Sequence, residues 1–133
     1  YNLSNEETLL FQIWIEPNIY NLSPKWENID LNSDSNKKIY ILASGEEKFE
    51  KLDLLKINQD ASVIKISGNK NHTLNYEFDK DRHGYFVLSK GKIQINEIEI
   101  HKRDGVYLSK LKKFNIDFME SSEIIFVDMP LIK

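Results

Sequence analysis

The sequence predicts an all-β fold with little or no helix, a small antiparallel barrel or sandwich of roughly ten short strands. Three observations lead to this prediction. Apolar residues recur at every second position through much of the chain, residues typical of turns separate these runs, and helical periodicity is almost absent. The pattern is clearest in residues 84–108, GYFVLSKGKIQINEIEIHKRDGVYL, which reads as the central meander of the fold.

Within this meander, pairs of apolar residues alternate with other residue types, which is typical of strands with one buried face. The pairs are Phe86 and Leu88, Ile93 and Ile95, and Ile98 and Ile100. Asn96-Glu97 can fill a two-residue hairpin turn, since Asn tolerates a positive φ. Gly91 and Gly105 stand where the chain is expected to turn sharply.

Composition narrows the function classes. The chain has 133 residues, 41% of them hydrophobic and 29% charged, an ordinary balance for one folded domain. It has no cysteine, which excludes disulfides and Cys-ligated metals and fits a reducing cytoplasm. A net charge of −3, with only Lys110, Lys112 and Lys113 clustered, predicts no nucleic-acid partner, and no apolar run is long enough to span a membrane.

The first part of the chain differs from the rest. Residues 9–15, LLFQIWI, carry apolar side chains at both odd and even positions, which predicts a strand covered on both faces. Pro17 ends this strand, and Ser23 can cap a short helical turn that begins at Pro24. Residues 32–38 contain no apolar side chain and predict an exposed loop. We therefore expect two parts, residues 1–38 and residues 39–133.

The second part is predicted to hold the remaining strands. Residues 46–52 are predicted to form a loop, and Pro130 to follow the last strand. Besides the meander, the expected strands are residues 39–43, 54–58, 62–67, 74–78, 114–118 and 124–127.

Two motifs resemble the bacterial pirin family of two-domain cupins, some members of which act as quercetin 2,3-dioxygenases. The first runs from Leu10 to Asn18, LFQIWIEPN, and is followed by Pro24 and Trp26-Glu27; the second is Asn58-Gln59-Asp60-Ala61. The resemblance implies a cupin-like double-stranded β-helix, or jelly roll. It also implies that residues 1–38 are the closing strand of a missing N-terminal cupin plus a connector. Residues 39–133 would then be the C-terminal cupin domain.

The resemblance further implies that the metal belongs to the N-terminal cupin. Cupin metal sites follow the pattern G-x5-H-x-H-x3–4-E-x6-G. With Gly91 as the closing glycine, the ligand slots fall on non-histidine residues: Glu77 or Phe78, Asp79 or Lys80, Gly84, and, in the second motif, Val106 or Leu108. His72, His83 and His101 do not have the spacing of the motif. We therefore expect no metal and no cofactor in this chain, and a divalent metal only in the N-terminal cupin.

The sequence thus predicts a non-catalytic C-terminal domain that supports a metal-bearing N-terminal cupin of the same protein. The residues expected at that contact, or at a homodimer contact through residues 9–15, are Leu10, Phe11, Ile13, Trp14 and Trp26. Two alternatives remain open. One is an enzyme with an unusual site around the three histidines. The other is a small-molecule binding module with an apolar barrel pocket lined by Tyr76, Phe78, Phe86, Tyr107, Phe114 and Phe118.

Overall fold

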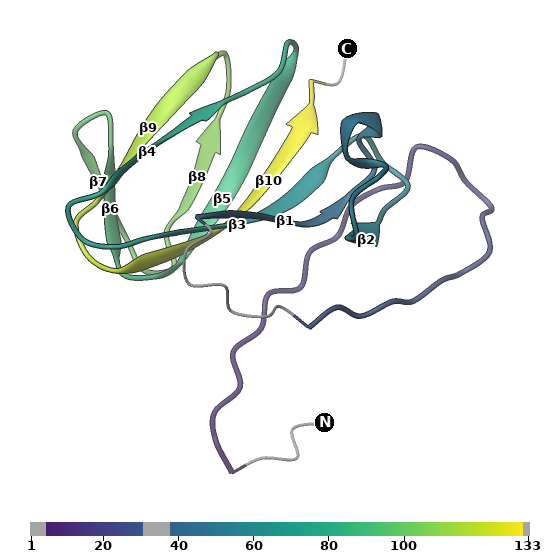
Figure 1. Ribbon diagram of the computed structural model, residues 1–133, viewed down its shortest axis with the longest axis horizontal. Helices are drawn as coiled ribbons and strands as arrows, with labels where there is room; N and C mark the ends of the chain where they lie inside the picture. The colour runs from purple at the N-terminus through teal and green to yellow at the C-terminus, as the bar shows by residue number, and fades with distance from the viewer. Residues whose placement is uncertain (1–4, 31–37, 132–133) are drawn as a thin grey trace.

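The computed structural model describes residues 5–30 and 38–131, and it confirms the predicted all-β class. Residues 5–30 form an extended arm without regular secondary structure, and the strands all lie after it (Figure 1). In chain order the elements are β1 (Ile39–Ser44), η1 (Glu47–Phe49), β2 (Leu55–Lys56), β3 (Ser62–Gly68), β4 (Thr73–Glu77), β5 (Arg82–Lys90), β6 (Lys92–Ile95), β7 (Ile98–His101), β8 (Gly105–Leu108), β9 (Lys113–Phe118) and β10 (Ser122–Pro130).

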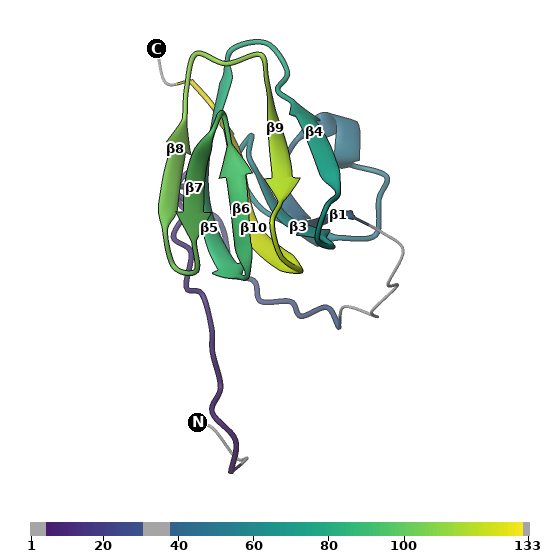
Figure 2. The same ribbon diagram turned by 90° about the vertical axis from the view of Figure 1, so that its left-hand side faces the viewer.

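The strands form two sheets that face each other (Figures 1 and 2). One sheet has six strands in the order β2-β1-β3-β10-β5-β8, and the other has four in the order β4-β9-β6-β7. All pairs are antiparallel except β1 with β2. The order places strands that are distant in sequence side by side, as a jelly roll does.

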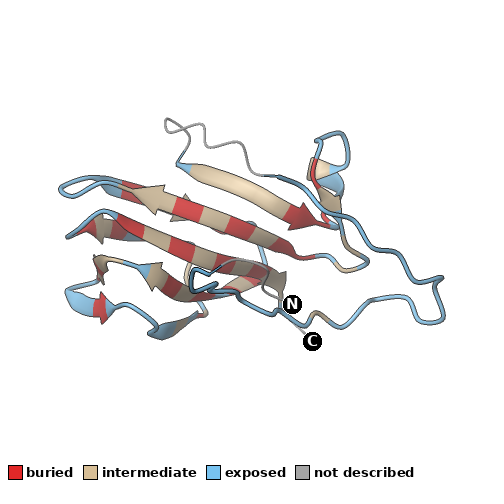
Figure 3. Cartoon of the chain, turned by 90° about the horizontal axis from the view of Figure 1, so that it is seen from below, coloured by how far each residue is buried: buried red, intermediate tan, exposed pale blue. Residues whose placement is uncertain are grey.

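Alternation along the strands decides which side chains enter the core between the sheets. In β10, Ile124 and Phe126 are fully buried and the residues between them are only partly covered, and β5 repeats the pattern with Phe86 and Leu88 (Figure 3). Each face of a strand therefore has its own environment. The core of buried residues comprises Ile64, Ile66, Leu74, Phe78, Phe86, Leu88, Ile93, Ile95, Ile100, Leu108, Phe114, Ile116, Phe118, Ile124 and Phe126.

The turns of the meander follow the sequence prediction in two of three places. Asn96 and Glu97 have φ values of 47° and 66°, so this pair makes the two-residue turn between β6 and β7 as predicted. Gly91 has a φ of 83° between β5 and β6. The prediction for Gly105 was wrong. Gly105 begins β8, and the left-handed residue of that turn is Arg103, with a φ of 77°.

Residues 9–15 do not form the predicted strand, and no helical turn follows Ser23 within residues 23–30. A strand exists only when a neighbouring segment pairs with its backbone. No strand lies beside residues 9–15 in the part of the chain that the structure describes. The predicted loop at 32–38 lies outside the described residues except for Lys38.

Three further boundaries differ from prediction. The segment predicted as a loop at 46–52 contains the 3-10 helix η1. The strand predicted at 54–58 shortens to Leu55–Lys56, because this segment pairs only with the end of β1. Pro130 ends β10 instead of following it. The division of the chain at residue 38 stays a prediction.

Glu97 holds a left-handed backbone conformation that costs a residue with a Cβ about 1–2 kcal/mol. We expect Glu97→Gly to raise the free energy of unfolding by about 0.5–1 kcal/mol, since Asn-Gly is the preferred pair for this turn. Urea denaturation measures the change. Gln94→Gly, in the middle of β6, is the control and should lower stability by about the same amount.

Candidate functional site

The arm (residues 5–30) carries most of the large apolar side chains that are exposed on the described part of the chain. Trp14 is 87% exposed and Trp26 is 86% exposed. Exposed apolar patches of this kind on a folded protein mark interaction sites. The other large apolar side chains exposed on the arm are Leu9, Leu10, Phe11, Ile13, Ile19, Tyr20, Leu22 and Ile29.

The arm is tied to the barrel at Glu16 and Asn18, inside the first of the two motifs. The backbone N–H of Asn18 donates a hydrogen bond of 2.8 Å to the carbonyl of Asn58, and the Gln59 side-chain Nε2 donates one of 2.7 Å to the carbonyl of Glu16. Both acceptor and donor on the barrel side belong to the second motif, Asn58-Gln59-Asp60-Ala61. The two motifs that are far apart in sequence therefore meet, and we call this contact the clasp.

The clasp adjoins a buried ion cluster, because Asp60 follows Gln59 directly. The guanidinium of Arg82, at the start of β5, pairs with three carboxylates from different parts of the chain. Its Nε lies 2.6 Å from Asp128 Oδ1, its Nη1 lies 2.9 Å from Asp60 Oδ1, and its Nη2 lies 3.3 Å from Glu46 Oε1. Arg82, Glu46 and Asp128 are buried, so this is the ion cluster of the barrel interior.

Neighbouring side chains satisfy the remaining polar atoms of the cluster. The Tyr76 hydroxyl, from the opposite sheet, donates a hydrogen bond of 2.6 Å to Asp128 Oδ2. The Ser62 hydroxyl donates to Glu46, and Lys48 pairs with Glu46 at 2.8 Å. A buried charge is tolerated only when it is paired and hydrogen-bonded in this way.

The environment of the ion cluster raises the pKa values of Tyr76 and Arg82. Burial raises the pKa of Tyr76 well above its usual value, and the hydrogen bond to the Asp128 carboxylate adds to the shift. Burial acts to lower the pKa of Arg82, but the bonds to Asp128 and Asp60 outweigh it and the net pKa is raised. At the edge of the cluster, the Lys48 ammonium holds the pKa of Asp79 below its usual value.

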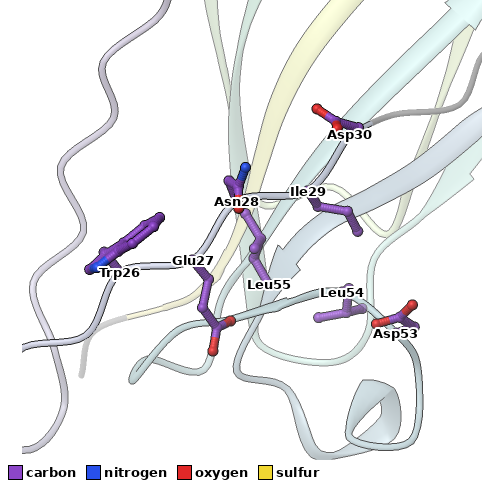
Figure 4. A pocket seen from close by; sticks show the side chains of 8 residues that line it. All are labelled: Trp26, Glu27, Asn28, Ile29, Asp30, Asp53, Leu54 and Leu55. Atoms are coloured by element: carbon purple, nitrogen blue, oxygen red, sulfur yellow. The ribbon is translucent and has the colours of Figure 1, made fainter.

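An open groove lies between the arm and the segment before β2 (Figure 4). Its volume is about 520 Å³, with Leu54 and Leu55 on the barrel side. Three carboxylates, those of Glu27, Asp30 and Asp53, stand among its lining residues together with Trp26, Asn28 and Ile29. The groove is thus mixed in polarity and wide open, and its walls contain no histidine.

The six residues predicted to line an apolar pocket are mostly packed against one another. Phe78 and Phe114 contact Tyr76 and Phe126 with ring centroids 5.4 to 6.0 Å apart, and Phe86 and Phe118 are buried in the same core. The expectation for Tyr107 was wrong. It is 59% exposed on the outer side of β8, because it pairs with Tyr85 and so has the opposite phase to buried Leu108.

The histidines do not come together. His72 lies in the turn before β4, His83 in β5 beside the ring of Tyr107, and His101 at the exposed end of β7. Among the described residues, no three His, Cys, Asp or Glu side chains are arranged to hold a metal ion. Within the same residues, no helix has the length and apolar character needed to cross a membrane.

Sequence reasoning missed the ion cluster, although a signal for it exists. Asp128 has the same phase as buried Ile124 and Phe126 in β10, and Arg82 has the same phase as buried Phe86 in β5. A charged residue in phase with buried apolar residues requires a buried partner. Which residue partners which could not be read from the sequence, since Glu46, Asp60 and Tyr76 lie on separate elements.

Comparison with known proteins identifies the family to which the chain belongs. The two facing sheets define a cupin-like β-sandwich. The profile of the quercetinase C-terminal cupin domain matches residues 41–129, and the chain belongs to this pirin family. The chain is 34% identical over 129 residues to the Pirin-like protein of Caulobacter vibrioides, covering 96% of this chain and 55% of that protein.

The chain also resembles two proteins of Escherichia coli. Quercetin 2,3-dioxygenase of Escherichia coli K12 is 24% identical over 131 residues, covering 98% of this chain and 54% of that protein. The crystal structure of YhhW from Escherichia coli shares the fold with a TM-score of 0.80 at 19% identity, covering 90% of this chain and 49% of that chain. The cupin-like prediction is thus confirmed, and the chain spans about half the length of its curated relatives.

We expect Arg82→Met to lower the free energy of unfolding by about 3–5 kcal/mol, because it leaves Asp128 buried without a cation and Glu46 with Lys48 alone. Urea denaturation of the chain measures the loss. Lys65→Met is the matched control. Its partner Glu123 is only half-buried, so this variant should lose less than about 1 kcal/mol. Equal losses for the two variants would contradict the role given to the cluster.

The raised pKa of Tyr76 makes stability depend on alkaline pH. The unfolded chain releases the phenol proton near pH 10, whereas the folded chain keeps it, so the free energy of unfolding falls as pH rises above about 10. We expect Tyr76→Phe to show a shallower fall than the parent chain in urea midpoints measured from pH 8 to pH 11. Tyr107→Phe, at an exposed phenol, should keep the parent slope.

Proposed function

We propose that this chain is a non-catalytic, metal-free C-terminal cupin domain of a pirin-family quercetin 2,3-dioxygenase, and that it supports a metal-bearing N-terminal cupin of the same protein. The observation that carries the proposal is the arm. It leaves the barrel extended and apolar, and it is held at the clasp by Asn58 and Gln59.

The arm has the properties of a strand that belongs to another sheet. Residues 9–15 are apolar on both faces and stay unpaired among the described residues, and an extended segment of this kind binds by adding itself to a sheet edge. In the proposal, that edge lies on the N-terminal cupin, and Leu10, Phe11, Ile13 and Trp14 are buried there. Trp26 then contacts the same domain from the connector.

The separation of the histidines supports the assignment of catalysis to the other half. His83 and His101 lie on strands of different sheets, and His72 lies in a turn. YhhW has been crystallised in complex with nickel(II), and its structure matches this chain with a TM-score of 0.77 over 48% of that protein. In the proposal, the divalent metal and the flavonol belong to the part of the protein outside the matched region.

A small-molecule binding module, the alternative from the sequence, has less support. The rings of its predicted lining residues Phe78 and Phe114 pack against each other and against Phe126, in tilted and edge-to-face contacts. A homodimer through residues 9–15 remains a proposal for the chain on its own, because an apolar unpaired segment also fits a second copy.

The test is metal content and flavonol turnover. We expect the 133-residue chain, purified without a His tag, to hold far less than one equivalent of any transition metal and to leave quercetin unchanged. The full-length protein that carries the chain is the positive control for both assays. About one equivalent of metal in the chain alone, lost on replacing His72, His83 and His101, would overturn the proposal and favour the enzyme alternative.

A further inference from the structure

The groove between the arm and the segment before β2 combines apolar side chains with an excess of negative charge. Leu54 and Leu55 line it on the barrel side, and Ile29 lines it on the arm side (Figure 4). Leu54 is buried, so this wall of the groove belongs to the folded body of the barrel. The volume of about 520 Å³ lies within the range of small-molecule sites, which is about 300–1,000 Å³.

The carboxylates of the groove have no cation beside them. Glu27 and Asp30 come from the arm and Asp53 comes from the segment before β2, and no basic residue is among those that line the groove. Within the described part of the chain, none of these three carboxylates forms an ion pair. A concave surface that carries charge of one sign attracts ligands of the opposite sign.

Lys56, which follows Leu55 in β2, does not neutralise the groove. Its ammonium group donates hydrogen bonds to the backbone carbonyls of Phe49, Glu50 and Leu52, at 3.0, 2.8 and 3.3 Å. These bonds hold together the turn that leads to Asp53. The barrel wall of the groove is therefore fixed by the fold, and the positive charge closest to Leu55 in sequence is already used inside that turn.

The arrangement of the carboxylates fits separated cationic groups better than one metal ion. Among residues 5–30 and 38–131, no three acidic side chains are grouped so that they could hold a metal. In Figure 4 the side chains of Leu54 and Leu55 lie between those of Glu27 and Asp53. A chain of methylene groups with an ammonium group at each end matches this order, because its ends pair with carboxylates while its middle contacts leucine.

We propose that the groove binds a linear aliphatic polyamine, a small molecule whose two or three ammonium groups are separated by methylene chains. Glu27 and Asp53 pair with its ends, and Leu54 and Leu55 contact its methylene groups. Trp26, which lines the groove on the arm side, offers its ring face to an ammonium group. This binding is separate from the proposed function, and neither depends on the other.

Trp26 also provides the signal for a test. The chain has two tryptophans, so Trp14→Phe leaves Trp26 as the single indole fluorophore. Spermidine is titrated into this variant while the fluorescence is recorded, and calorimetry of the parent chain gives the dissociation constant. Butylamine, with one charge, and 1,8-octanediol, with the length of spermidine and no charge, are the ligand controls.

We expect spermidine to bind at least about tenfold more tightly than butylamine, and octanediol to leave the fluorescence unchanged. Glu27→Gln and Asp53→Asn should each weaken spermidine binding about three- to fivefold, and the double variant about tenfold or more. Glu120→Gln is the matched control. It removes an exposed carboxylate from the turn between β9 and β10, outside the groove, and should change the dissociation constant by less than about twofold.

Equal weakening by Asp53→Asn and Glu120→Gln would show a general attraction between charges and would overturn the proposal, as would unchanged binding by the double variant. A trilysine peptide that binds more than about tenfold more tightly than spermidine would overturn it in favour of a basic protein segment. Calorimetry is repeated on the full-length protein, where we expect a dissociation constant within about threefold. Loss of binding there would overturn the proposal. The proposed function is tested separately, by metal content and flavonol turnover.

Discussion

The pairing of Arg82 with Glu46, Asp60 and Asp128 is the interaction on which the arrangement of the chain depends. One guanidinium joins the loop after β1, the turn before β3, the start of β5 and the end of β10. Such a buried ion cluster adds little net stability compared with an apolar core of the same shape, because removing charges from water is costly. Its effect here is to fix which segments of the chain lie side by side. A shift of one residue in the register of β5 or β10 would turn Arg82 or Asp128 to the outer face and break their pair.

The ion cluster is also connected to the arm on the surface, through the clasp. Asp60 is held by Arg82, and its neighbour Gln59 holds the carbonyl of Glu16, so the direction of the arm is coupled to the interior of the barrel. The two motifs, which lie far apart in the sequence, therefore meet at the clasp. Ala61 is buried beside them, where its N–H donates to the carbonyl of Gln59 and its own carbonyl accepts from Gly45. The two motifs thus form the two sides of the clasp.

The proposed function rests on the surfaces of the chain more than on its fold, since the jelly roll hosts many unrelated activities. The interior is filled by aliphatic and aromatic side chains and the ion cluster, and within the described residues the arm carries most of the large apolar side chains that are exposed. The exposed apolar side chains of the arm are thus available for contact with another protein surface. The chain spans about half the length of the relatives it matches, which agrees with the proposal that the arm binds the rest of the protein.

The sequence by itself determined the class of fold, most strand positions and the Asn96-Glu97 turn, because alternation and turn chemistry are local properties. Its two motifs also sufficed to identify the family. Only the tertiary structure decided that residues 9–15 pair with no strand among the described residues, that Tyr107 lies outside the core and that Arg82 binds three carboxylates. These outcomes depend on which segments lie side by side. A strand needs a neighbour and a buried charge needs a partner, and no local pattern states where either will be.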